Sequence, residues 1–289
     1  MISIHLGEDS IFTDFSGFRQ LLRFYENCRQ YHDTTIAIAL DDVRWVDGNL
    51  CAFLGAILYR LNKENQLSFS IDAKQVSEKC GILFHNNFIP LDQNLRQYQK
   101  KSCIPYKGFL PKQKDEFINY LENELLVHAA MPKFADETKE KLIDDLTEVY
   151  ANIDKHAETD DPFFVCGQHY VRQEKIHFTI CDLGVGFYKK IKERKPDKIN
   201  SDGDSILWAI EGNSTKPDAP GGSGLKNLHK YFDDNSGGLQ IYTGDAGWCS
   251  KTMKAGSIYP NGVTSLRNTY IGSVINLEFN KKTLISGKF

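Results

Sequence analysis

The stretch Asp182-Leu183-Gly184-Val185-Gly186 decides how the second half of this chain is interpreted. An acidic residue ends an apolar run typical of a strand, and two separated glycines follow it. Glu148 and Asn152 lie upstream, four residues apart, and therefore share one face of an expected helix. Gly221-Gly222-Ser223-Gly224-Leu225 precedes another expected helix downstream. This order predicts a nucleotide site, although the sequence has no Gly-x-x-x-x-Gly-Lys-Ser/Thr phosphate loop.

The bulk composition is that of an ordinary globular chain. Its 289 residues carry a net charge of -3, which gives no reason to expect nucleic acid or an anionic membrane as a partner. No apolar run approaches the roughly 18 residues that a membrane span needs. The seven cysteines form no Cys-x-x-Cys pair, which argues against a disulfide framework or a zinc site. We therefore expect a cytoplasmic protein without a membrane span.

The first third of the chain alternates strand-like and helix-like segments, which predicts an α/β layer with some parallel pairing. Strands are expected at 2–6, 35–40 and 67–71, and helices at 15–31, 49–61 and 76–84. Residues 96–114 are rich in Lys and Arg and contain Pro105, Gly108 and Pro111, so we expect a linker there. The predicted domains are residues 1–105 and 106–289.

The second domain is predicted to be an α+β layer with a mixed, mostly antiparallel sheet. Its expected helices cover 113–130, 137–156, 205–211 and 224–232, and its expected strands cover 163–171, 175–182, 239–243 and 271–279. The segment 187–222 is polar apart from its one helical stretch.

Glu148 and Asn152 carry side chains suited to phosphate chemistry. An Asn amide oxygen is a hard neutral ligand of the kind that Mg²⁺ accepts. A carboxylate one helical turn earlier can accept a proton from water or from a hydroxyl group. Taken alone, the pair is more often an ordinary solvated helix face.

Asp182 with its following glycines suits the base of a nucleotide, and the later glycine-rich segment suits the phosphates. A carboxylate at a strand end can accept a hydrogen bond from the amine of adenine, and Gly184 and Gly186 allow the backbone to approach the base. Gly222, Ser223, Gly224 and Leu225 place free N–H groups at a helix start, where phosphate binds, and Lys155 and Lys226 add charge. Alone, these are an Asp-Gly turn and a flexible loop. Their combined order favours the nucleotide site.

These motifs together resemble the ATP-binding domain shared by gyrase, Hsp90, histidine kinases and MutL, over about residues 110 to 280. The resemblance implies a Bergerat-type α/β sandwich in which Asn152 binds Mg²⁺ and Asp182 recognises adenine. It implies that Glu148 positions or deprotonates the attacking group and that 187–222 is a mobile lid. Ser273 occupies the place of a family threonine that helps to hold adenine.

The first third resembles the STAS domain of anti-sigma-factor antagonists. The match is a strand at 36–40 followed by Val46-Asp47-Gly48-Asn49, a helix, a strand and a short helix. Phosphorylatable members carry a serine just after the aspartate, whereas Gly48 and Asn49 stand there in this chain. The departure places phosphorylation at this position in doubt.

Two functions follow from these resemblances. The first is an ATPase or a serine/threonine-type protein kinase of a bacterial-type signalling system, closest to histidine-kinase-like or anti-sigma-factor kinase domains. The alternative is a non-catalytic switch in which ATP controls the binding and release of a partner. The expected partner is another protein, bound through the STAS-like domain or the lid, and a homodimer is a further possibility. A histidine kinase is disfavoured because the expected acidic residue does not follow His128. Histidine kinases also carry a phosphoacceptor hairpin of two long helices before the ATP domain, and only the helix at 113–130 is available here.

Overall fold

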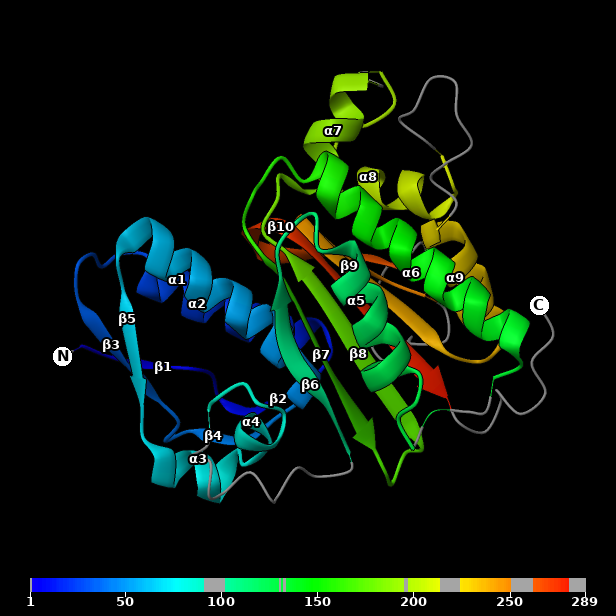
Figure 1. Ribbon diagram of the computed structural model, residues 1–289. Coiled ribbons are helices and arrows are strands. Elements are labelled where there is room, and N and C mark those ends of the chain that lie inside the picture. Colours follow the sequence, from blue (N-terminus) through cyan, green and yellow to red (C-terminus); the bar gives the residue numbers. More distant parts are fainter. Residues whose placement is uncertain are drawn as a thin grey trace.

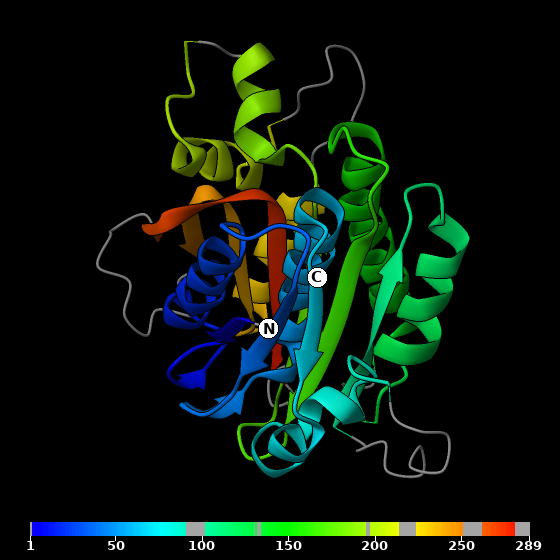
Figure 2. The ribbon, with the colours of Figure 1, turned by 90° about the vertical axis from the view of Figure 1, so that its left-hand side faces the viewer.

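The computed structural model describes residues 2–90, 102–129, 131, 134–194, 197–213, 224–250 and 262–280. Sheets and helices alternate as four layers across the molecule (Figures 1 and 2). A parallel sheet lies at one side, followed by the helices α1 (Phe15–Cys28) and α2 (Cys51–Asn65). A second, antiparallel sheet comes next, and a second group of helices covers its far face. The expected combination of an α/β part with a mostly antiparallel part is confirmed at this level.

The N-terminal sheet has the parallel pairing that the alternating pattern predicts. Its strands follow the order β1-β3-β5, with β1 at Ile2–His5, β3 at Thr35–Ala39 and β5 at Ser68–Ile71. Two short strands, β2 (Asp9–Ile11) and β4 (Val43–Val46), form a separate parallel pair that the sequence did not predict. Strands of three or four residues are too short to display a periodicity. The predicted helix at 76–84 is instead two helices, α3 (Ala73–Lys79) and α4 (Ile82–His85).

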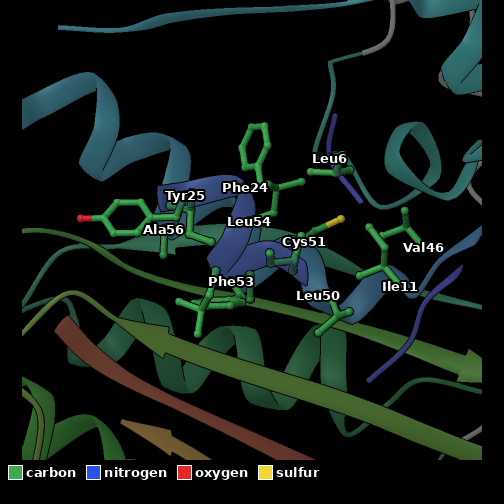
Figure 3. Close-up of a cluster of buried hydrophobic side chains, with 14 of the residues drawn as sticks. Leu6, Ile11, Phe24, Tyr25, Val46, Leu50, Cys51, Phe53, Leu54 and Ala56 are labelled. Atoms are coloured by element: carbon green, nitrogen blue, oxygen red, sulfur yellow. The ribbon is translucent and has the colours of Figure 1, made fainter. Parts of the chain in front are cut away.

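Helix α2 is buried around most of its circumference because it lies between the two sheets. A short 3-10 turn, η1 (Gly48–Leu50), leads into it. Asp14 caps the start of helix α1, since its side chain accepts a hydrogen bond of 2.9 Å from the Gly17 N–H. Figure 3 shows the apolar cluster that these helices share with the strands around them, including Leu6, Phe24 and Phe53.

The second sheet has five strands in the order β6-β7-β8-β10-β9, and every neighbouring pair is antiparallel. Their bounds are Cys103–Phe109 for β6, Phe163–Tyr170 for β7, Lys175–Asp182 for β8, Gly238–Cys249 for β9 and Val263–Asn280 for β10. The predicted hairpin of β7 and β8 is confirmed, and β9 and β10 are longer than expected.

The linker expected at 96–114 is wrong for its described part, because β6 lies there as the edge strand of the sheet. Pro105 is tolerated because the β6–β7 register shifts between Ile104 and Lys107, so that no ladder hydrogen bond is needed from the proline. The Tyr106 N–H at this bulge donates instead to the Asn86 carbonyl oxygen, 2.7 Å away. The predicted boundary at residue 105 therefore falls inside a strand.

The far face of this sheet is covered by helices. They are α5 (Lys114–Tyr120), the π-helical turn η3 (Leu121–Leu125), α6 (Asp136–His156) and α9 (Gly224–Asp234). The predicted apolar stripe of α6 is confirmed, since all five of its members are buried: Leu142, Leu146, Val149, Tyr150 and Ile153. Two further helices, α7 (Gly186–Arg194) and α8 (Asp202–Ile210), lie at the end of the sheet where β8 ends (Figure 1).

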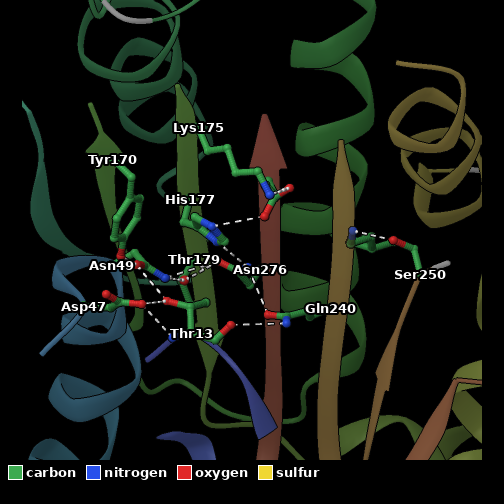
Figure 4. Close-up of polar contacts among 12 residues, drawn as sticks. Thr13, Asp47, Asn49, Tyr170, Lys175, His177, Thr179, Gln240, Ser250 and Asn276 are labelled. Carbon is green, nitrogen blue, oxygen red and sulfur yellow. Dashed lines mark hydrogen bonds and ion pairs between the residues drawn. The ribbon is translucent and has the colours of Figure 1, made fainter. Parts of the chain in front are cut away.

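The face of the antiparallel sheet that meets the N-terminal layers also carries a buried polar network (Figure 4). The side chain of Asn49 donates to the Thr179 hydroxyl at 2.9 Å and to the Asn276 amide oxygen at 3.3 Å. Its own amide oxygen accepts from the Tyr170 hydroxyl at 2.8 Å. The turn that resembles the STAS phosphorylation site is therefore enclosed, and its Asn49 is fully buried against the second sheet.

The apolar core likewise crosses the predicted boundary. One cluster combines residues of α1 and α2 with side chains of the antiparallel sheet, among them Phe164, Cys181 and Val274. The stacked rings of Phe18 and Tyr242, 3.7 Å apart at their centroids, also join α1 to β9. No helix within the described ranges is both long and apolar enough to cross a bilayer.

We predict that replacing Asn49 by alanine lowers the free energy of unfolding by about 2 kcal/mol or more, because Thr179 and Asn276 lose partners inside the molecule. Urea denaturation followed by far-UV circular dichroism measures the change. The matched control is Asn123→Ala, whose exposed side chain bonds only within one helical turn and whose loss should cost about 0.5 kcal/mol or less. Equal effects of both substitutions would contradict the importance of the network.

Candidate functional site

Three polar side chains stand in one row across three neighbouring strands. Asp182 of β8 lies directly opposite Ser273 of β10, and Ser273 lies opposite Thr243 of β9. Side chains alternate between the two faces of a strand, so this row shares its face with Ile180, Ile275 and Ile241, which belong to the core beneath α6. The structure thus brings the predicted residues Asp182 and Ser273 together at one end of the sheet.

Asp182 is buried and hydrogen-bonded, with 7% of its surface exposed. Its carboxylate accepts a hydrogen bond of 2.8 Å from the Gly184 N–H and further hydrogen bonds from Ser273. Burial raises its pKa to about 6, although these hydrogen bonds and the charge of Arg60 act in the opposite direction. Asp182 is therefore an acceptor whose charge changes near neutral pH, in contrast to an exposed aspartate.

The glycines that follow Asp182 are needed by the chain's own packing. A Cβ atom at Gly184 would lie 2.3 Å from the Cβ of Ala157, just after α6 ends, and the next N–H, of Val185, donates to the Ala157 carbonyl oxygen at 2.9 Å. Gly186 has a φ of +74°, and a Cβ there would lie 2.6 Å from the Thr243 hydroxyl. The expectation that these glycines also leave room for a base stays a prediction. In the structure they seat the loop against α6 and β9.

Helix α6 connects this loop to the third predicted motif. Glu148 and Asn152 are both half-buried on α6, as their spacing predicts. Gly224, the first residue of α9, packs on Glu148 so closely that a methyl group there would lie 3.0 Å from Glu148 Oε2. One turn before Glu148, the buried carboxylate of Asp145 accepts a hydrogen bond of 2.9 Å from Asn227 of α9. The start of α9 is thus held beside Glu148.

One predicted site residue belongs to the apolar core, and others lie outside the described residues. Leu225 is buried in the apolar core between α6 and α9, so its side chain anchors the helix. Gly222 and Ser223 lie outside the described residues, as does the side chain of Lys155. The described part of the expected lid, 187–222, is largely the helices α7 and α8. Helix α8 is tied to β9, since Asp202 accepts a hydrogen bond of 3.1 Å from the Asp245 N–H.

The sequence did not reveal three residues that hold the loop after Asp182. Thr243 is fully buried, donates to the Gly272 carbonyl oxygen at 2.9 Å and accepts from the Phe187 N–H at 3.3 Å. Tyr270 of β10 donates to the Asp182 carbonyl oxygen at 2.8 Å, and Arg60 of α2 donates to the Leu183 carbonyl oxygen at 2.7 Å. An arginine in the middle of an apolar helix was the one available signal, because such a charge needs a buried partner.

A cation at this site would take most of its ligands from water and from a bound phosphate. Among the residues that the structure describes, no three His, Cys, Asp or Glu side chains converge as a metal site. A Mg²⁺ ion that keeps several waters and takes its charged ligands from phosphate needs as few as one protein oxygen, and the half-buried Asn152 amide of α6 could supply it. The residues present therefore fit Mg²⁺ delivered with a nucleotide.

Comparisons with protein-family models, with curated proteins and with solved structures found no match.

We predict that Asp182 makes stability fall as pH rises from about 4 to about 6. Its pKa in the folded chain is about 6, above the value of 3.8 that is usual for a free aspartate, so the folded state holds the proton more tightly and loses that advantage as pH rises. The change corresponds to about 3 kcal/mol in the free energy of unfolding. Urea denaturation at pH 4.5 and 7.5 tests it: Asp182→Asn should gain stability over the wild type at the higher pH. The exposed Asp160→Asn is the control, and equal pH dependence in both variants would contradict the prediction.

Proposed function

We propose that this chain binds Mg-ATP between the Asp182–Gly186 loop and the start of α9, along the polar face of α6. The observation that carries the proposal is the convergence of three separate motifs on one helix. Glu148 of α6 touches Gly224 at the start of α9, and Ala157 just beyond α6 touches Gly184 of the loop. Asn152 lies on α6 between these two contacts. The described parts of motifs that are individually weak in sequence thus lie along one helix.

The base would be recognised at the row formed by Asp182, Ser273 and Thr243. The exocyclic amine of adenine is a donor, and an ionised carboxylate is the strongest acceptor that this row offers. Its burial among Ile180, Ile275 and neighbouring apolar side chains makes the hydrogen bond more selective, because a base without a donor leaves the carboxylate unpaired. Adenine therefore fits better than a base that presents a carbonyl oxygen to Asp182.

The phosphates would lie at the start of α9. This helix has 11 residues, and its first N–H groups and partial positive charge favour anions. Bound Mg²⁺ would neutralise phosphate charge, and Asn152 is the neutral ligand available to it on α6. Glu148, beside Gly224, is placed where it can orient or deprotonate water or a protein hydroxyl. These roles support an ATPase or a serine/threonine-type protein kinase.

A non-catalytic switch controlled by ATP is the second candidate. It is favoured by the contact of Arg60, on the N-terminal helix α2, with the Leu183 carbonyl oxygen in the nucleotide loop. Through this contact, nucleotide binding at the loop would act directly on the STAS-like part of the chain. ATP turnover distinguishes the two candidates, since both require ATP binding.

We expect Asn152→Ala to abolish or nearly abolish the binding of Mg-ATP, because it removes the proposed protein ligand of the metal. Asp182→Ala should weaken binding by about tenfold to a hundredfold, the loss of one hydrogen bond to a charged group. Isothermal titration calorimetry measures both, with Asn119→Ala on exposed α5 surface as the control. Wild-type affinity in both site variants would refute the assignment.

For turnover, we expect Glu148→Gln to retain Mg-ATP affinity but to lower the rate of phosphate release or of protein phosphorylation by about a hundredfold or more. The amide keeps the size of the side chain and cannot accept the proton. Radiolabelled ATP follows both reactions in one assay, with and without a candidate protein substrate. If the wild type binds ATP and neither reaction occurs, the switch is the correct function.

A further inference from the structure

The loop that follows Asp182 is held from the N-terminal layers as well as from its own sheet. Arg60 of α2 is 5% exposed in its side chain, and its guanidinium donates to the Leu183 carbonyl oxygen at 2.7 Å. The preceding carbonyl oxygen, of Asp182, accepts from the Tyr270 hydroxyl at 2.8 Å. Two successive carbonyl groups at the end of β8 are therefore fixed by side chains that reach them from the face opposite to α6.

These contacts belong to one packed cluster. The Leu183 side chain is buried in the core that α1 and α2 form with the second sheet. The ring of Tyr270 meets Phe53 of α2 edge to face at a centroid distance of 4.9 Å. The Arg60 guanidinium carbon lies 5.7 Å from the centre of the same Tyr270 ring. A shift of α2 must therefore move Leu183, and with it the Asp182 and Gly184 on either side.

We propose that Arg60 is a positioning residue that couples the packing of the N-terminal helix α2 to nucleotide binding at the Asp182–Gly186 loop. The proposal rests on the proposed function for its ligand, and it assigns to the N-terminal layers a part in completing the site. Arg60 does not contact the nucleotide in this scheme; it fixes the backbone from which Asp182 and Gly184 extend.

The coupling has a reciprocal consequence. If α2 in place favours ATP, then bound ATP favours α2 in place by the same free energy. A substitution that loosened the packing of α2 would weaken nucleotide binding, and bound ATP would oppose that loosening. Leu183 is the residue through which the two parts are coupled, because the N-terminal layers hold both its side chain and its carbonyl group.

Charge gives Arg60 a second, separable effect on the site. The described titratable groups near Asp182 are Arg60 from α2, Cys181 from β8 and Tyr270 from β10, while Glu64 and Tyr25 lie near Arg60 itself. Arg60 is the only cation among these five described groups, and it favours the ionised form of the Asp182 carboxylate. Loss of its charge therefore raises the pH below which Asp182 is protonated and becomes a weaker, uncharged acceptor.

The test compares Arg60→Met, which keeps the length of the side chain, with Arg60→Lys, which keeps the charge. We expect Arg60→Met to weaken Mg-ATP binding by about tenfold or more and to move the pH midpoint of binding upward. Arg60→Lys should keep that midpoint close to the wild type. Titrations of each protein with Mg-ATP from pH 5 to 8 measure both quantities. The control is Arg23→Met on α1, which removes an exposed ion pair with Glu8.

A second measurement needs no nucleotide. Amide hydrogen exchange of Gly184 and Val185, which donate to Asp182 and Ala157, should become faster in ATP-free Arg60→Met. In the wild type, added Mg-ATP should slow the exchange of α2. Unchanged exchange at Gly184 and Val185, or unchanged Mg-ATP affinity in Arg60→Met, would overturn the proposal, and an unmoved pH midpoint would overturn the separate charge effect of Arg60. A wild type that binds no ATP would refute the proposed function and the coupling, while exchange would still show whether Arg60 holds the loop.

Discussion

The burial of the antiparallel sheet on both faces is the constraint on which the rest of the structure depends. Alternate side chains of β8 serve different layers: Ile180 faces the helices α6 and α9, while Cys181 faces α1 and α2. Because the period of a strand is two, Asp182 must return to the α6 face and its neighbours must lie toward the N-terminal layers. One strand end therefore places an acceptor beside α6 and an anchor, Leu183, in the opposite core.

The same constraint explains why the N-terminal part is bound so specifically. Apolar packing alone tolerates several orientations of one layer on another. The polar network favours one orientation, because Asn49 of the N-terminal layers bonds to Thr179, Asn276 and Tyr170 of the sheet. Any sliding of α2 over the sheet would leave several buried polar atoms without partners. The position of Arg60 relative to Leu183 is thus fixed by residues at some distance from both.

Much of the fold could be predicted from sequence because its long elements have strong periodicity. The stripe of α6 from Leu142 to Ile153 and the β7–β8 hairpin are of this kind. Strand β6 was missed because Pro105 and the lysines around it are typical of a linker, and its strand depends on pairing with β7. In the candidate site, the motifs named Asp182 and Ser273, which the structure places opposite each other on neighbouring strands. Thr243, Tyr270 and Arg60 were missed because their contacts join residues far apart in the chain.

The energetics of Asp182 support the binding role that we propose for it. A buried carboxylate whose pKa is raised by burial lowers the stability of the folded chain at neutral pH. An asparagine at this position would keep the acceptor for the Gly184 N–H without that cost. Arg60 and Ser273 reduce the penalty but do not remove it. A buried carboxylate is stabilised most by a ligand that donates a further hydrogen bond to it. Acidic side chains with strongly shifted pKa values are concentrated in functional sites. Packing alone explains the glycines and Leu225, whereas it gives no reason for the charge on Asp182.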